Sequence, residues 1–355
     1  MAKFVILCGV LVSLSGCATL GWYGQAARGQ LEIMSQRQDI AGLIERPETD
    51  PVLAERLSLA LEIRAFAVTE LGLPDSRSYT RFADLGREAA VWNVVATPRF
   101  DLRPKTWCYP LVGCLAYRGF FRQQRAEALA ARLSEQGFDA AVFPVAAYST
   151  LGWFADPVLN TMLSRSDARL AALIFHELAH EKLFLAGDTE FSEGYATAVE
   201  RIGVERWLIA RGEGEALEAW RRDEALHAQF TERLLVTRAR LIEIYASDGS
   251  EADMLAARAE AFEQLRASLE GLDRAAGDRR FSRWAERGIN NAHLALVATY
   301  EAAVAGFLRL YAECKRDLAC FHACAADLAR ADEATRREVL RDTGVDATAV
   351  DVGRC

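Results

Sequence analysis

The sequence predicts an α+β fold that is predominantly α-helical, with a small β-sheet ahead of a histidine-bearing helix and a long αα-hairpin after it. Three observations support this prediction. Apolar residues recur at helical spacing along most of the 355 residues, short strand-like runs between Pro and Gly turns cluster at about 91–157, and His-Glu-Leu-Ala-His at 176–180 follows them. The composition is ordinary for a globular protein, at 51% hydrophobic and 26% charged residues, so we expect a single domain over residues 17–355.

The first residues are typical of an export signal. A lysine supplies a positive start, and residues 4–14 form an apolar run that is too short to span a bilayer. Leu-Ser-Gly-Cys at 14–17 then resembles a bacterial lipobox, which predicts that residues 1–16 are removed and that Cys17 carries lipid. Ala18, where Asp would retain an enterobacterial lipoprotein in the inner membrane, favours the outer membrane and a domain facing the periplasm. An ordinary cleaved signal peptide or an uncleaved anchor is the alternative.

The elements ahead of the histidine motif follow from periodicity and from turn residues. Helices are expected at about 24–46, 51–72 and 122–136. Pro51 near the first turn opens the second of these helices, and Gly137 ends the third. Strands are expected at 91–95, 114–117 and 140–148, where β-branched and aromatic residues stand between Pro and Gly turns.

Two histidines at i and i+4 are the most informative pattern in the chain. His176 and His180 share one face of a helix, so both imidazoles reach one tetrahedral cation, with Glu177 beside them to act on a metal-bound water. Asp167 is expected to cap this helix and Gly187 to follow its end. A helix that carries two histidines by chance is the alternative, and the helical context argues against it.

A second helix from about Ser192 to Ile209 offers a third ligand, after a loop at residues 188–189. Glu193 and Glu200 share one face of this helix at i and i+7. We expect Glu193 to complete a site for one zinc ion per chain, leaving the fourth position for water. Glu200 is the rival ligand, or an acceptor that orients one of the histidines, or a solvated surface carboxylate.

Two long amphipathic segments follow the predicted zinc helices, which span about 168–209. They cover about 214–246 and 251–273, with Ser-Asp-Gly-Ser at 247–250 between them, and we expect them to pair as an αα-hairpin. Packing is its expected role, and partner binding is the alternative. A helical region over residues 280–355 ends the chain.

Cysteine usage agrees with an oxidising compartment. Cys108 and Cys114 flank a turn-rich Tyr-Pro-Leu-Val-Gly segment, which a local disulfide would close. Four further cysteines offer two more bridges of undetermined pairing: Cys314, Cys320, Cys324 and Cys355. A second zinc site that includes His322 is the alternative, but the cysteine spacings do not match a usual zinc knuckle.

The two motifs together resemble a known group of enzymes. His-Glu-x-x-His followed by Ser-Glu-Gly-Tyr-Ala-Thr-Ala-Val-Glu at 192–200 is similar to the gluzincin pattern of thermolysin-type and aminopeptidase N-type enzymes. Twelve residues separate His180 from Glu193, where those enzymes have about eighteen. Over nearly its full length the chain also resembles a bacterial family of predicted aminopeptidases attached as lipoproteins, and segments 17–30, 147–157 and 288–292 carry this resemblance. The resemblance implies a gluzincin-like zinc metallopeptidase core and a peptide or protein substrate.

The resemblance also suggests where the substrate lies. In gluzincins a strand ahead of the zinc helix binds the peptide by β-type hydrogen bonds, and residues 148–156 take that place here. Gly152 would allow close approach of the substrate and Trp153 would line a pocket; a core strand with buried aromatics is the alternative. Hydrolysis also needs a donor to the developing oxyanion, for which Tyr300 and His293 are the candidates.

The expected function is zinc-dependent peptide hydrolysis at the cell envelope, with a metal-activated water and Glu177 as general base. An aminopeptidase is the first choice, although no Gly-x-Met-Glu-Asn segment is present and only Glu200 or Asp156 suggests itself for the substrate ammonium. An envelope endopeptidase and a non-catalytic zinc lipoprotein in envelope assembly are the alternatives, and the presence of Glu177 argues against the latter. A net charge of −8 without a basic run argues against nucleic acid as a partner.

Overall fold

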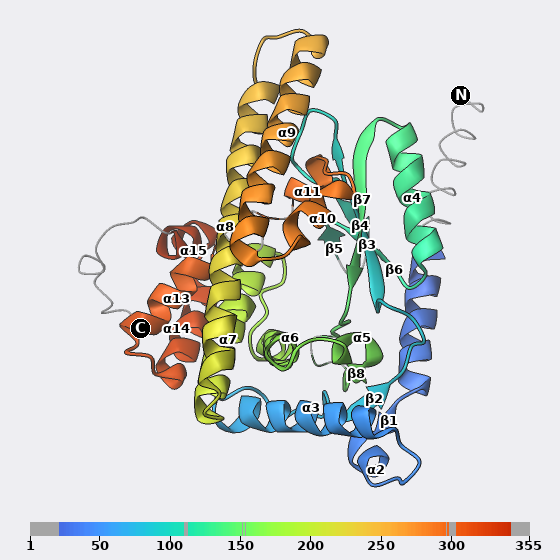
Figure 1. Ribbon diagram of the computed structural model, residues 1–355, viewed down its shortest axis with the longest axis vertical. Coiled ribbons are helices and arrows are strands. Elements are labelled where there is room, and N and C mark those ends of the chain that lie inside the picture. The colour runs from blue at the N-terminus through green and yellow to red at the C-terminus, as the bar shows by residue number, and fades with distance from the viewer. Residues whose placement is uncertain are drawn as a thin grey trace, which may run out of the picture.

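The computed structural model describes residues 21–109, 113–150, 152, 154–295, 297 and 303–341. Helices dominate this part of the chain, and three small sheets lie on the side of the molecule away from the C-terminal helices (Figure 1). The architecture is therefore α+β and predominantly helical, as predicted. No helix within the described ranges has the length and apolar character needed to cross a membrane.

The central sheet is built around β3 (Val91–Pro98), which pairs antiparallel with β6 (Arg118–Phe120) and β7 (Phe138–Val145). Alternate residues of β3 face opposite sides, as a pleated strand requires. Trp92, Val94 and Ala96 pack beneath α4 (Gln123–Glu135), whereas Val95 packs on the other face against α11 (Asn291–Ala295). The sheet is thus covered by a helix on each side.

Two smaller sheets flank this one. β4 (Trp107–Tyr109) and β5 (Gly113–Leu115) form a hairpin that the Cys108–Cys114 disulfide closes. The third sheet consists of β1 (Gln38–Asp39), β2 (Arg81–Ala83) and β8 (Val158–Leu159). The short helix α5 (Asn160–Leu163) follows β8 directly.

Two sequence-based boundaries are wrong. The helix expected at 24–46 is interrupted: residues 21–35 are helical, β1 follows, and α2 covers Ile40–Ile44. Residues 38–39 are drawn into strand pairing with β2, and Asp39 caps α2 by accepting from the Gly42 N–H at 3.0 Å. The strand expected at 114–117 ends at Leu115, and a bend at 116–117 separates it from β6.

The main core joins α3 (Pro51–Thr69), α6 (Asp167–Lys182) and α7 (Thr189–Ala210) to the C-terminal helices. α6 and α7 pack very closely. A Cβ added at Gly203 of α7 would lie 2.7 Å from Leu71 Cδ1 and 2.7 Å from Phe175 Cδ2 on α6. A side chain at this position would therefore force the two helices apart.

The predicted αα-hairpin is confirmed by α8 (Gly214–Tyr245) and α9 (Glu251–Ala276). It has its own core, in which Leu234 and Leu241 pack with Phe262, Leu265 and Leu269. α10 (Arg280–Glu286) returns against it, and the Asp273 carboxylate accepts from the Phe281 and Ser282 N–H groups at the turn.

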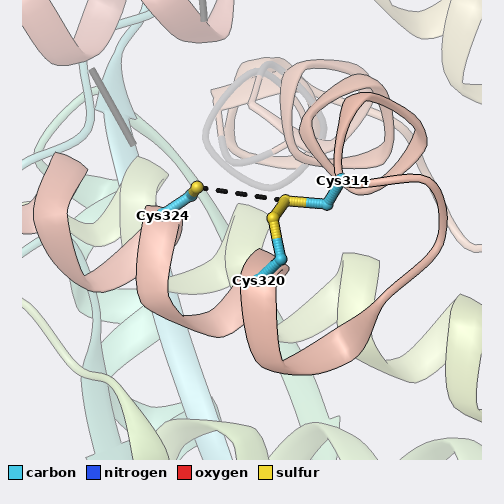
Figure 2. A group of neighbouring side chains, drawn as sticks. All are labelled: Cys314, Cys320 and Cys324. Carbon is cyan, nitrogen blue, oxygen red and sulfur yellow. Dashed lines mark hydrogen bonds between the residues drawn. A yellow bond between two sulfur atoms is a disulfide. The ribbon is translucent and has the colours of Figure 1, made fainter. Parts of the chain in front are cut away.

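Three helices end the described chain: α13 (Val304–Glu313), α14 (Leu318–Arg330) and α15 (Glu333–Leu340). A disulfide joins Cys314 to Cys320, and the Cys324 sulfur lies 3.9 Å from that of Cys314 (Figure 2). Cys355 lies outside the described residues. His322 is hydrogen-bonded to Tyr195 and to the Leu71 carbonyl, so it is not a partner of these sulfurs.

The close packing of α6 on α7 can be tested at Gly203. We expect Gly203→Ala to lower the free energy of unfolding by about 1–3 kcal/mol, because overpacking against Leu71 and Phe175 outweighs the better helix propensity of alanine. Denaturant unfolding measures the change. The matched control is Gly271→Ala in α9, where a Cβ would meet nothing nearer than 3.7 Å, and this variant should gain about 0.5–1 kcal/mol. Equal effects at both positions would contradict the interpretation.

Candidate metal centre

The helix that carries the two histidines begins at Asp167, one residue before the expected start. Ser166, not Asp167, is the N-cap residue, and its hydroxyl accepts from the Arg169 N–H at 3.4 Å. Asp167 instead occupies the first turn and pairs with Arg56 of α3. The buried residues of α6, which include Leu170, Ile174, Phe175 and Leu178, hold the helix in the main core.

The start of α7 differs more from the sequence-based expectation, because Asp188 is not merely a loop residue. It caps α7, accepting from the Phe191 N–H at 3.0 Å, and its other carboxylate oxygen pairs with Arg336 of α15 at 2.8 Å. The helix therefore begins at Thr189 rather than Ser192. Glu193 therefore lies within the first turns of α7, on the side that faces α6.

His176, His180 and Glu193 converge. The Nε2 atoms of the two histidines lie 3.1 Å apart, and Glu193 Oε2 lies 3.3 Å from His176 Nε2 and 3.6 Å from His180 Nε2. Tetrahedral ligands at bond lengths of about 2.0–2.1 Å stand about 3.3–3.4 Å from one another. The three donor atoms are thus spaced to fit around one small cation, and imidazole and carboxylate are ligands that zinc accepts.

Glu200 lies behind His176 and not among these donor atoms. Its Oε2 lies 3.0 Å from His176 Nδ1, which is the ring nitrogen directed away from the centre. A histidine that gives Nε2 to a metal carries its proton on Nδ1, so this N–H donates to the Glu200 carboxylate and fixes the ring. Of the three sequence-based alternatives for Glu200, this geometry favours the orienting acceptor.

The electrostatics of the centre favour positive charge. Burial opposes a charge on His176, but its hydrogen bonds to Glu193 and Glu200 outweigh burial and raise its pKa well above the usual value. Burial also opposes the charge of Glu193, yet its contacts with the two histidines lower its pKa to about 2. In the metal-free protein a proton on His176 therefore offsets part of the carboxylate charge, and a metal ion must displace that proton.

The residues around Glu193 fix its helix in place. The Ser192 hydroxyl accepts from the Leu185 N–H at 3.0 Å and so ties the α6–α7 connection to α7. A Cβ on Gly194 would lie 2.6 Å from that of Ala303, so glycine permits this contact between α7 and the start of α13. Ser192 and Gly194 of the Ser-Glu-Gly-Tyr pattern thus each have a structural role beside Glu193.

Tyr195 completes that pattern. Its hydroxyl donates to His322 Nδ1 at 2.8 Å, and His322 Nε2 donates to the Leu71 carbonyl at 2.9 Å. Burial lowers the pKa of His322 to about 4, so this histidine is neutral near pH 7 and suited to both hydrogen bonds. The chain of hydrogen bonds links α7 to α14 and to the segment just after α3.

Tyr117, which sequence reasoning missed, approaches the centre from the bend between β5 and β6. Burial raises the pKa of its hydroxyl, and the carboxylates of Glu193 and Glu177 raise it further. The phenol is therefore close to both acids and remains a hydrogen-bond donor at neutral pH. Its position depends on how the sheet packs against α6, which no local sequence signal reports.

His293, one of the two predicted oxyanion donors, is not brought to this centre by any described contact. His293 lies between the rings of Phe143 and Trp284 and is hydrogen-bonded to Asn290 at 3.0 Å, and burial lowers its pKa to about 4. Tyr300 and Trp153 lie outside the described residues.

The loop before α6 comes close to the centre. Gly152 has a φ of +77°, a conformation that favours glycine, and a Cβ there would stand 3.5 Å from the Glu181 side chain. Asp156 is only 3% exposed and accepts from the Thr150 N–H at 2.7 Å and hydroxyl at 2.8 Å. Burial raises the pKa of Asp156 to about 6, although both hydrogen bonds to Thr150 oppose the rise, and Glu181 and Glu177 add to it.

Two packed helices bring two histidines and a glutamate together beside a small sheet. This arrangement defines a candidate hydrolytic metal centre. The chain belongs to the family described as "Putative aminopeptidase", whose model matches residues 21–340. No curated protein and no solved structure matches the chain. Membership in this family supports a peptidase that acts on peptides.

The raised pKa of Asp156 predicts a pH-dependent stability. Because the native protein binds this proton more tightly than the unfolded chain does, the stabilisation is complete below about pH 4 and is lost as the pH rises through about 6. Asp156→Asn does not titrate. Relative to this variant, the metal-free wild type should therefore lose up to about 3 kcal/mol of unfolding free energy between pH 4 and pH 7. Denaturant unfolding across this range tests it, and a constant difference between the two proteins would refute it.

Proposed function

We propose that the protein is a zinc-dependent aminopeptidase of the cell envelope. The observation that best supports this proposal is the spacing of 3.1, 3.3 and 3.6 Å among the donor atoms of His176, His180 and Glu193. Glu177 directly follows His176 on the same helix, and Glu200 orients His176. The family membership supports hydrolysis of peptides as the reaction.

The residues around the centre have distinct roles in this proposal. Bound zinc would lower the pKa of a water molecule and polarise the scissile carbonyl. Glu177 accepts the proton of the attacking water and delivers it to the leaving amine. Tyr117 donates a hydrogen bond to the carbonyl oxygen as negative charge develops there, and its raised pKa keeps the phenol protonated for this purpose. Tyr300, outside the described residues, stays the second candidate for this donor.

The proposal is tested by Glu177→Gln, with metal content and turnover measured on the full-length chain in detergent. We expect about one zinc per chain in both the wild type and this variant, and at least about a 100-fold loss of peptide hydrolysis in the variant, because only proton transfer is removed. His176→Ala is the contrasting variant and should lose the metal.

The substrates are a short peptide and its N-acetylated form. Hydrolysis of the free-amine peptide alone would establish an aminopeptidase, and hydrolysis of both would establish an endopeptidase. Zinc without hydrolysis of either would favour a non-catalytic zinc protein, and a chain without zinc would refute the central claim.

We also propose that the protein is a lipoprotein anchored through Cys17, because Leu-Ser-Gly-Cys at 14–17 resembles a lipobox. Cys17→Ser should move the protein from the membrane fraction to the soluble fraction, since acyl chains on this residue are the proposed anchor. Fractionation of cells that express each form measures the change. A variant that still sediments with membranes would show that lipid on Cys17 is not the anchor.

A further inference from the structure

The candidate centre carries more negative charge than a divalent cation balances. Glu193 and Glu200 both contact His176 and together match the two charges of such a cation. Glu177, Glu181 and Asp156 lie nearby, and within the described ranges none of these three forms an ion pair with a basic side chain. A second, singly charged cation would therefore be bound favourably beside the metal.

The arrangement on α6 shows where that cation lies. Glu177 and Glu181 are at i and i+4, so they form a row beside the row of His176 and His180, with Cβ atoms about 5–6 Å apart. In this proposal a water molecule activated by Glu177 attacks the carbonyl carbon of the first peptide residue. The α-nitrogen of that residue is only two bonds from this carbon. One turn further along the helix, Glu181 is in reach of that nitrogen.

Glu181 has an unsatisfied carboxylate oxygen. Its Oε1 is fully buried, and none of the residues that the structure describes donates a hydrogen bond to it, which is costly for a carboxylate oxygen. The rest of its side chain lies opposite Gly152, where a Cβ would stand 3.6 Å from Cδ and 3.7 Å from Oε2. The absence of a side chain at Gly152 leaves space beside this carboxylate.

Two other carboxylates are less suited to bind a ligand directly. Asp156 is hydrogen-bonded to Thr150 and almost fully buried, and Glu200 is hydrogen-bonded to His176. Asp156 nevertheless adds to the local potential. Burial first, and then the charges of Glu177, Asp156 and Glu181, raise the pKa of the buried Tyr79 well above its usual value, so the three acids act on one region.

We propose that Glu181, supported by the charge of Asp156, binds the α-ammonium group of the first residue of a peptide and so restricts the centre to free amino termini. This inference rests on the proposed function. It assigns the amine-binding role to a residue that sequence reasoning did not select, in place of Glu200 or Asp156.

Binding to the inactive protein tests the assignment without turnover. Full-length Glu177→Gln protein, loaded with zinc, is titrated calorimetrically with Leu-Gly-Gly and with N-acetyl-Leu-Gly-Gly. We expect the free-amine peptide to bind about 10- to 100-fold more tightly, and Glu181→Gln in this background to abolish that preference while leaving the acetylated peptide unchanged. Zinc content and melting temperature should not change.

The matched control is Glu215→Gln, an exposed glutamate at the start of α8, which should keep the preference. Glu181→Ala serves as a second variant should the amide fail to fold. A preference that survives both Glu181 substitutions would overturn the assignment, and so would equal binding of the two peptides by the Glu177→Gln protein. Failure of the proposed function shows separately, as a wild type that holds no zinc or hydrolyses neither peptide.

Discussion

The close approach of α6 and α7 is the constraint on which the rest of the centre depends. Two histidines on one helix and a glutamate on the other bring their donor atoms within 3.1–3.6 Å, which is possible only while the helices stay in contact. Gly203 removes the side chain that would separate them, and Ser192 and Asp188 fix the connection between them. Packing therefore holds together polar groups that would otherwise be better solvated by water.

The parts of the site that depend on local geometry were predictable. Helical spacing alone puts His176 beside His180, and the same rule places Glu193 and Glu200 on one face. The short interval between His180 and Glu193 is explained by Asp188: because it caps α7 early, only residues 183–188 connect the two helices. The strands expected at 91–95, 114–117 and 140–148 were also predictable, since turn residues bound each of these runs.

What escaped prediction depends on partners far away in the sequence. Residues 38–39 read as helix, but their pairing with β2 decides their conformation, and periodicity carries no information about such a partner. Asp188 looked like a plain loop residue because its partner, Arg336, comes almost 150 residues later. The roles of Tyr117 and Glu181 could likewise not be predicted, because they depend on the packing of the sheet and of the loop at Gly152 beside α6.

The hydrogen bond between Tyr195 and His322 has a consequence for the order of assembly. α7 is packed and hydrogen-bonded against α13 and α14, and Asp188 is paired with α15. The segment that carries Glu193 therefore has its full set of neighbours only when the chain is made to about residue 340. Glu193, a candidate ligand from the middle of the sequence, is thus fixed in place only after the last helices have formed. If the protein is exported unfolded, as the proposed lipoprotein would be, it would bind metal only after translocation and from the metal ions of the destination compartment.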